Sequence, residues 1–145
     1  MIEAKELRLG NYVMYNGIVM KVSEILSPKP RKDERYNNKY VIELFDGGGL
    51  VDATLDEISG IPLDEYWFNK FKFVVRDKTF SLNYGGESMR YAILETDVRN
   101  PFIVYFHGRF GFNMNEGRKN GDYCFNEVHR LQNTYFELTN KELLL

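Results

Sequence analysis

Residues 7–26 read LRLGNYVMYNGIVMKVSEIL, and this stretch decides the fold of the first half of the chain. Two apolar runs flank the pair Asn16-Gly17, and both residues of such a pair tolerate the positive φ values of a two-residue hairpin turn. The pattern therefore predicts a β-hairpin with strands over 7–15 and 18–26.

Beyond this hairpin the sequence predicts a small antiparallel sheet. A polar loop with two prolines follows over 27–38, and proline blocks regular structure. The next strand, 40–45, is closed by a glycine-rich turn over 46–49 and returns through Leu50-Val51. Short strands joined by tight turns are typical of a strongly bent SH3-like barrel.

The second half of the chain is expected to hold a short central helix and a second antiparallel sheet. Thr54 to Glu57 fits a capping box for one helical turn, and Asp64 can cap a helix over 65–71. Apolar runs then predict strands over 73–76, 79–84, 90–95 and 102–106, the first two joined by a turn at Asp77-Lys78.

The clearest helix lies at the C-terminal end. From Asn126 onward, apolar residues recur at steps of three, four and three, which is the spacing of one buried helix face: Val128, Leu131, Tyr135 and Leu138. Asn126 is a reasonable N-cap, and Asn140 can take the left-handed conformation that ends a helix.

These elements predict an α+β fold in one compact domain over residues 1–145. Two lobes are expected within it: an SH3-like β lobe over 1–58 and an α+β lobe over 59–145. In the second lobe the C-terminal helix is expected to pack on the second sheet.

Composition limits the classes of protein to consider. Of 145 residues, 43% are hydrophobic and 28% charged, and the net charge is -2. Transmembrane and disordered classes are therefore not expected, and a mildly acidic chain argues against a protein that wraps duplex DNA. A single cysteine, Cys124, excludes an intramolecular disulfide, and the polar N-terminus predicts a reducing cytoplasm.

No catalytic or metal-binding motif is expected to operate in this chain. Gly47-Gly48-Gly49 continues into a strand, so a hairpin turn explains it better than a phosphate loop. His107 and His129 lack metal-ligand spacing, and His129 is expected on the exposed side of its helix. The aromatic surroundings of Cys124 favour a buried inert thiol. We therefore predict a protein that is not an enzyme and has no cofactor or metal.

One candidate binding surface lies beside the core stripe of the C-terminal helix. It consists of His129, Gln132, Asn133 and Phe136, together with Arg109 and Arg118 of the preceding loop. Arginine and amides beside aromatic rings suit an anionic or nucleotide-like ligand. The alternative is that the amides bond to the backbone of the loop over 108–121. Asn133 fits that structural role, whereas His129 and Gln132 are the preferred binding residues.

A second candidate surface is the loop over 29–36, which holds four basic and two acidic side chains. Arg31, Lys32 and Arg35 would meet phosphates there, and Tyr36 would stack on a base. A solvated loop explains the same residues.

Three segments carry a resemblance to a known family: ELRLGNYV over 6–13, GIPLDEYWFNKF over 60–71 and VHRLQNTYFELT over 128–139. In these segments the chain resembles small uncharacterised proteins of phages and prophages of gut Bacteroidetes. It departs from their pattern at two helix caps, where Asp64 and Asn140 replace Thr and Gly. The resemblance implies a phage accessory protein inside a bacterial cell, and it supplies no site residues.

Two functions follow as hypotheses. The first is a non-enzymatic phage protein, expected to form a homo-oligomer, that acts against the host defence by sequestering a small nucleotide-type signal or by blocking a host protein. The second is a nucleic-acid-binding accessory module that uses the SH3-like sheet, against which the net charge counts. Neither hypothesis involves a membrane.

Overall fold

A computed structural model describes the following parts of the chain: residues 1–79, 88–94, 101–106, 112–113 and 124–145. The chain divides into two compact units. The first unit contains residues 1–62 and 127–142, and the second unit contains residues 63–126 and 143–145.

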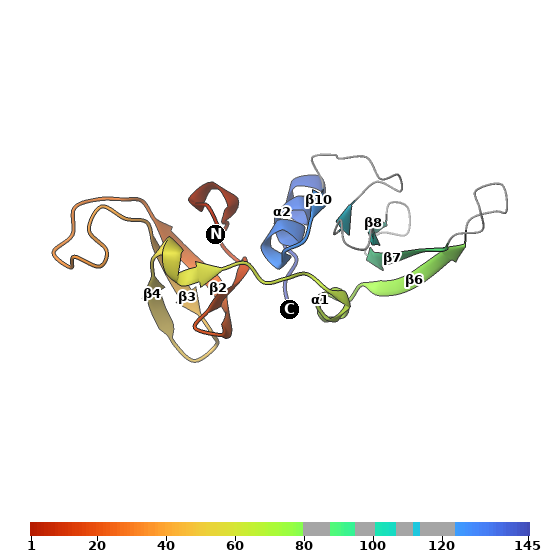
Figure 1. Cartoon of the computed structure of the whole chain (residues 1–145), viewed down its shortest axis with the longest axis horizontal. Helices are drawn as coiled ribbons and strands as arrows, with labels where there is room; N and C mark the ends of the chain where they lie inside the picture. Colours follow the sequence, from red (N-terminus) through yellow and green to blue (C-terminus); the bar gives the residue numbers. More distant parts are fainter. Residues whose placement is uncertain (80–87, 95–100, 107–111, 114–123) are drawn as a thin grey trace. The chain divides into compact units, whose positions relative to one another are not determined.

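The first unit is built on a five-stranded antiparallel sheet, drawn from red to yellow in Figure 1. Its strands are β1 (Tyr12–Tyr15), β2 (Ile18–Leu26), β3 (Val41–Phe45), β4 (Leu50–Ala53) and β5 (Ile58–Ser59). Their order is β4-β3-β2-β1-β5, so the last strand returns beside the first. This order, with the 3-10 helix η2 (Leu55–Glu57) before the last strand, is that of SH3-like folds.

The hairpin predicted from residues 7–26 is confirmed, although its first strand is shorter than expected. Tyr15 pairs with Ile18 across the turn. Asn16 and Gly17 have φ values of 48° and 77°, the left-handed conformations that this tight turn requires. The Asn-Gly pair therefore sets the register of β1 against β2.

The core of the first unit lies on one face of this sheet. Strand alternation places every second side chain on that face, and two residues of the N-terminal segment join it. Its buried members are Ile2, Leu7, Val13, Met20, Val22, Ile42, Leu44, Ala53 and Ile58. The N-terminal segment also contains the 3-10 helix η1 (Ala4–Glu6), in which Glu3 and Glu6 cap each other.

The C-terminal helix α2 (Val128–Thr139) belongs to the first unit, which differs from the expected packing on the second sheet. The backbone N–H of Val128 donates to the carbonyl of Ile61 at 2.9 Å, which fixes the start of the helix. Its N-cap is Glu127 rather than Asn126, and Asn140 ends it in the left-handed conformation, as predicted. Helical periodicity shows which face of a helix is buried but not which element covers it.

The second unit combines a short helix with another antiparallel sheet. The helix α1 (Glu65–Lys70) begins at Asp64, whose side chain accepts from the N–H of Trp67 as predicted. The strands lie in the order β10-β9-β8-β7-β6. Their bounds are β6 (Val74–Thr79), β7 (Ser88–Leu94), β8 (Phe102–Phe106), β9 (Phe112–Asn113) and β10 (Cys124–Phe125). Two sheets, a short central helix and a C-terminal helix make this an α+β protein, as expected.

Aromatic side chains form the interior of the second unit. The ring of Phe68 in α1 lies 5.3 Å from that of Phe73, 5.2 Å from that of Phe106 and 5.1 Å from that of Phe112. Offset and edge-to-face contacts at these distances stabilise a core beyond simple burial. Packing therefore explains these four phenylalanines.

The turn predicted at Asp77-Lys78 is wrong. Both residues lie inside β6, where Asp77 pairs with Arg90 and Lys78 pairs with Met89 of β7. The pair contains neither glycine nor asparagine, so nothing in it demands a turn.

Within the described residues, no helix has the length and apolar character needed to cross a membrane.

Candidate functional site

The side-chain amide of Gln132 forms hydrogen bonds with two backbone groups of the first unit. Gln132 is 1% exposed; its Oε1 accepts a hydrogen bond from the N–H of Tyr12 at 2.8 Å. Its Nε2 donates to the carbonyl of Gly10 at 3.0 Å. These bonds give Gln132 a structural role between α2 and the segment before β1. Its predicted role in ligand binding stays a prediction.

Asn133 continues the same connection one residue further along the helix. Its Nδ2 donates to the carbonyl of Glu6 at 2.6 Å, and its Oδ1 accepts from Nδ2 of Asn11 at 2.9 Å. The Oδ1 of Asn11 in turn accepts from the N–H of Arg8 at 2.8 Å. Both helix amides bond to the N-terminal segment. The loop over 108–121 lies largely outside the described residues, so bonding of these amides to that loop stays a prediction.

His129 is buried, so the expectation of an exposed histidine is wrong. Its side chain is 0% exposed, and among the described residues neither ring nitrogen has a hydrogen-bond partner. Burial lowers the pKa of His129 from its ordinary 6.5, although the carboxylate of Glu127, 3.8 Å from Nε2, acts in the opposite direction. A ligand in solvent would not reach this ring without a rearrangement.

Phe136, also predicted as a binding residue, lies under a cation. The guanidinium carbon of Arg8 is 3.4 Å from the centre of the Phe136 ring. This distance is well within the range of a cation–π interaction. Nη2 of Arg8 also lies 3.4 Å from Oε1 of Glu142, just beyond the end of α2. The backbone N–H of Arg8 donates to Oδ1 of Asn11, which holds the backbone at this position, and the Phe136 ring orients the guanidinium.

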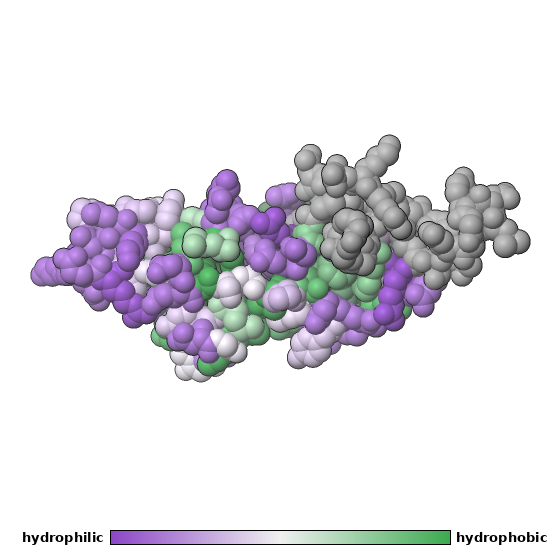
Figure 2. Space-filling model, in the orientation of Figure 1, coloured by the Kyte–Doolittle hydropathy of each residue, from purple (hydrophilic) through white to green (hydrophobic). Residues whose placement is uncertain are grey.

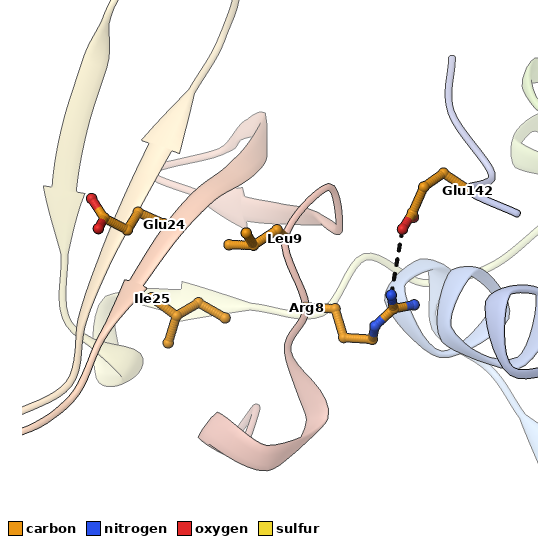
Figure 3. Close-up of a pocket in the computed structure, with 5 residues that line it drawn as sticks. All are labelled: Arg8, Leu9, Glu24, Ile25 and Glu142. Atoms are coloured by element: carbon orange, nitrogen blue, oxygen red, sulfur yellow. Dashed lines mark hydrogen bonds and ion pairs between the residues drawn. The ribbon is translucent and has the colours of Figure 1, made fainter. Parts of the chain in front are cut away.

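Arg8 lines a pocket of about 540 Å³ in the first unit. The other lining residues come from the same segment, from β2 and from the chain after α2: Leu9, Glu24, Ile25 and Glu142. Figure 3 shows Leu9 on the side of the pocket near β2, and the Arg8–Glu142 pair near α2. The volume is in the range of small-molecule sites.

The pocket offers three kinds of contact. Arg8 has a planar fork of N–H donors suited to a phosphate or carboxylate. Leu9 and Ile25 supply apolar surface, and Leu9 is 56% exposed. Glu24 is exposed and, among the described residues, has no ion-pair partner, so it can accept from hydroxyl or amino groups. This set fits a molecule with an anionic end and a flat or apolar body that carries donors.

None of the five residues that line the pocket was predicted from the sequence as a site residue. They lie in three segments separated by up to 134 positions, and none belongs to a spaced motif. Of the predicted binding residues that the structure describes, Phe136 is the one that contacts a residue of the pocket, Arg8. Sequence patterns identify motifs within a segment but not side chains that three segments bring together.

The basic loop is held mostly by its own residues. The guanidinium of Arg31 donates to the carbonyls of Ser27, Tyr36 and Lys39 at 3.0–3.2 Å. Arg35 forms an ion pair with Glu57 at 2.6 Å, and its guanidinium lies over the ring of Tyr36. This loop is the hydrophilic end of the first unit in Figure 2.

Of the four residues proposed for phosphate and base contacts, the structure therefore gives intramolecular partners to three. The Tyr36 hydroxyl donates to the carbonyl of Asp52 at 3.2 Å. Lys32 is exposed. Nucleic-acid binding through this loop stays a prediction.

Two other predicted residues, Arg109 and Arg118, lie outside the described residues. Over the described ranges, no three His, Cys, Asp or Glu side chains are grouped so that they could hold a metal ion.

Comparisons with protein-family models, with curated protein sequences and with solved structures give no match for this chain.

Proposed function

We propose that this chain is a non-enzymatic binding protein that takes up a small nucleotide-type ligand in the pocket beside Arg8. The observation that carries the proposal is the position of the Arg8 guanidinium, 3.4 Å above the Phe136 ring at the wall of a pocket of about 540 Å³. A cation oriented in this way needs little further ordering when an anionic group binds.

Each part of the pocket supports a nucleotide-type ligand. The phosphate meets the guanidinium of Arg8 by charge-assisted hydrogen bonds. The base or sugar lies against Leu9 and Ile25, and Glu24 accepts from a hydroxyl or an exocyclic amine. One anionic end and one donor-bearing end distinguish such a ligand from inorganic phosphate and from a neutral nucleoside.

The biological role that we propose is sequestration of a nucleotide signal in the cytoplasm of a bacterial host. The resemblance to small phage proteins supports this setting. Binding without turnover is sufficient for a protein that withholds a signal.

The proposal is tested by ligand release and by direct titration. The protein is purified from a bacterial cytoplasm, unfolded, and the released small molecules are identified by mass spectrometry. A panel of linear and cyclic nucleotides is then titrated by calorimetry and by thermal shift. A ligand at 100 times its Kd should raise the free energy of unfolding by about 2.7 kcal/mol.

The matched variants are Arg8→Gln and Lys21→Gln. Both remove one positive charge from the first unit, but only Arg8 lines the pocket. We expect Arg8→Gln to abolish the thermal shift and Lys21→Gln to retain it. The proposal fails if no nucleotide is released and none binds, or if both variants bind as the wild type does.

A further inference from the structure

We infer that the carboxylate of Glu142 is an internal competitor for the anionic group of the ligand. This inference rests on the proposed function of the pocket. Glu142 faces the guanidinium of Arg8, as Figure 3 shows, and a bound phosphate would take its place.

The turn that ends α2 brings Glu142 to this position. Asn140 adopts the left-handed conformation, and its N–H donates to the carbonyl of Phe136 at 2.7 Å. The N–H of Lys141 then donates to Oγ1 of Thr139 at 3.2 Å. The ring of Phe136 thus contacts Arg8, and its carbonyl holds the turn that leads to Glu142. The positive charge of Arg8 and the negative charge of Glu142 therefore meet beside Phe136.

The contact between Glu142 and Arg8 is weak enough to be replaced. It joins one guanidinium nitrogen to one carboxylate oxygen at 3.4 Å, whereas strong charge-assisted bonds measure about 2.7–2.9 Å. The two side chains are 31% and 41% exposed. Over the described part of the chain, Glu142 makes no other ion pair or side-chain hydrogen bond, so it can turn into solvent.

The competition selects the class of anion. A phosphate offers several oxygens and can make two parallel bonds with the guanidinium fork, which a single carboxylate contact at this distance does not. The ring of Phe136 covers one face of the guanidinium, so its N–H edge remains for an anion. A phosphate and the Glu142 carboxylate would repel each other at the N–H edge of Arg8. The group that forms the stronger hydrogen bonds with the guanidinium therefore stays there. Ligands that end in a phosphate are therefore favoured over neutral nucleosides.

The experiment measures the affinity for adenosine 5′-monophosphate, inorganic phosphate and adenosine by calorimetry. The variant Glu142→Gln removes the competing charge, and Glu137→Gln is its matched control. Glu137 is exposed on α2 and does not line the pocket. We expect Glu142→Gln to tighten binding of the monophosphate about 2- to 5-fold, the range for an exposed ion pair. Adenosine binding should not change.

A third variant, Glu142→Asp, keeps the charge but shortens the side chain by one methylene, and it should give an intermediate gain. The melting temperature of each variant shows that the fold is retained. If wild type and Glu142→Gln bind the monophosphate equally, or if Glu137→Gln gains as much, Glu142 is no competitor, although the pocket still binds nucleotides. If neither wild type nor Glu142→Gln binds any phosphate ligand, the proposed function fails and the competition with it.

Discussion

The side-chain oxygen of Gln132 accepts a hydrogen bond from the backbone N–H of Tyr12 at 2.8 Å, although the two residues are 120 positions apart in the chain. The same amide donates to the carbonyl of Gly10, so one buried side chain satisfies two backbone groups where the chain enters β1. These two bonds hold α2 to the start of β1 through a polar side chain, in addition to the apolar contacts of the core.

The variant Gln132→Ala should therefore destabilise the first unit strongly. It leaves the N–H of Tyr12 and the carbonyl of Gly10 without this partner, and each unpaired buried group costs about 1–3 kcal/mol. We expect a loss of about 2–4 kcal/mol in the free energy of unfolding by urea. Glu137→Ala, at an exposed position of the same helix, should change it by less than about 0.5 kcal/mol. Equal effects of the two variants would show that the bonds of Gln132 do not contribute.

Asn133 and Asn11 should be energetically coupled. Their side chains share a hydrogen bond of 2.9 Å, and each also bonds to the backbone of the N-terminal segment. In a double-mutant cycle of Asn11→Ala and Asn133→Ala, we expect the two losses of stability to differ from additivity by about 0.5–3 kcal/mol. Additive losses in urea denaturation would mean that the two amides act independently.

The fold was predicted from local signals, and most of the site was not. Asn16-Gly17, Asp64 and Asn140 each impose a backbone conformation on their neighbours, and the structure confirms all three. His129 shows the opposite case, because a polar residue one step from a core stripe can be buried when its neighbours are. Whether it is buried depends on what packs against α2, and no spacing within the helix contains that information.

The buried His129 should make stability depend on pH. Burial lowers its pKa below the ordinary 6.5, so near and below that pH the unfolded chain binds more protons than the folded chain. Stability should therefore fall as the pH drops below about 6.5, by at most about 1.4 kcal/mol per pH unit for one group. Denaturation between pH 7 and pH 5 measures this slope.

In the variant His129→Leu, the free energy of unfolding should no longer fall between pH 7 and pH 5. The variant His107→Asn, which removes the only other histidine of the sequence, should keep this dependence on pH. The pKa of Glu6 is lowered by the N–H of Glu3 and by Arg130 from an ordinary value of 4.5. Its stabilising contribution is therefore lost only as the pH falls below that value. A slope that persists in His129→Leu would assign the titration to another group.

Phe136 should support ligand binding through Arg8 without touching the phosphate. Replacing it by leucine keeps an apolar side chain but removes the ring on which the guanidinium lies. An exposed cation–π contact contributes about 0.5–1 kcal/mol. We therefore expect Phe136→Leu to weaken binding of adenosine 5′-monophosphate about 2- to 5-fold in calorimetry. Unchanged affinity would show that the ring does not position Arg8.

The effect of Gly60→Ala on the free energy of unfolding should change sign when Glu127 is also replaced by alanine. A side chain at position 60 would occupy the space of the Glu127 carboxylate, which bonds to Nε of Arg130 at 3.1 Å. Gly60→Ala should therefore displace Glu127 and cost up to about 1 kcal/mol, the range for an exposed ion pair. In a Glu127→Ala background that obstacle is absent, and the same substitution should stabilise by about 0.4–1 kcal/mol, because alanine restricts the unfolded chain more than glycine. Urea denaturation of the four proteins decides between the two signs, and a cost that persists in the double variant would place the obstacle in the backbone around residue 60.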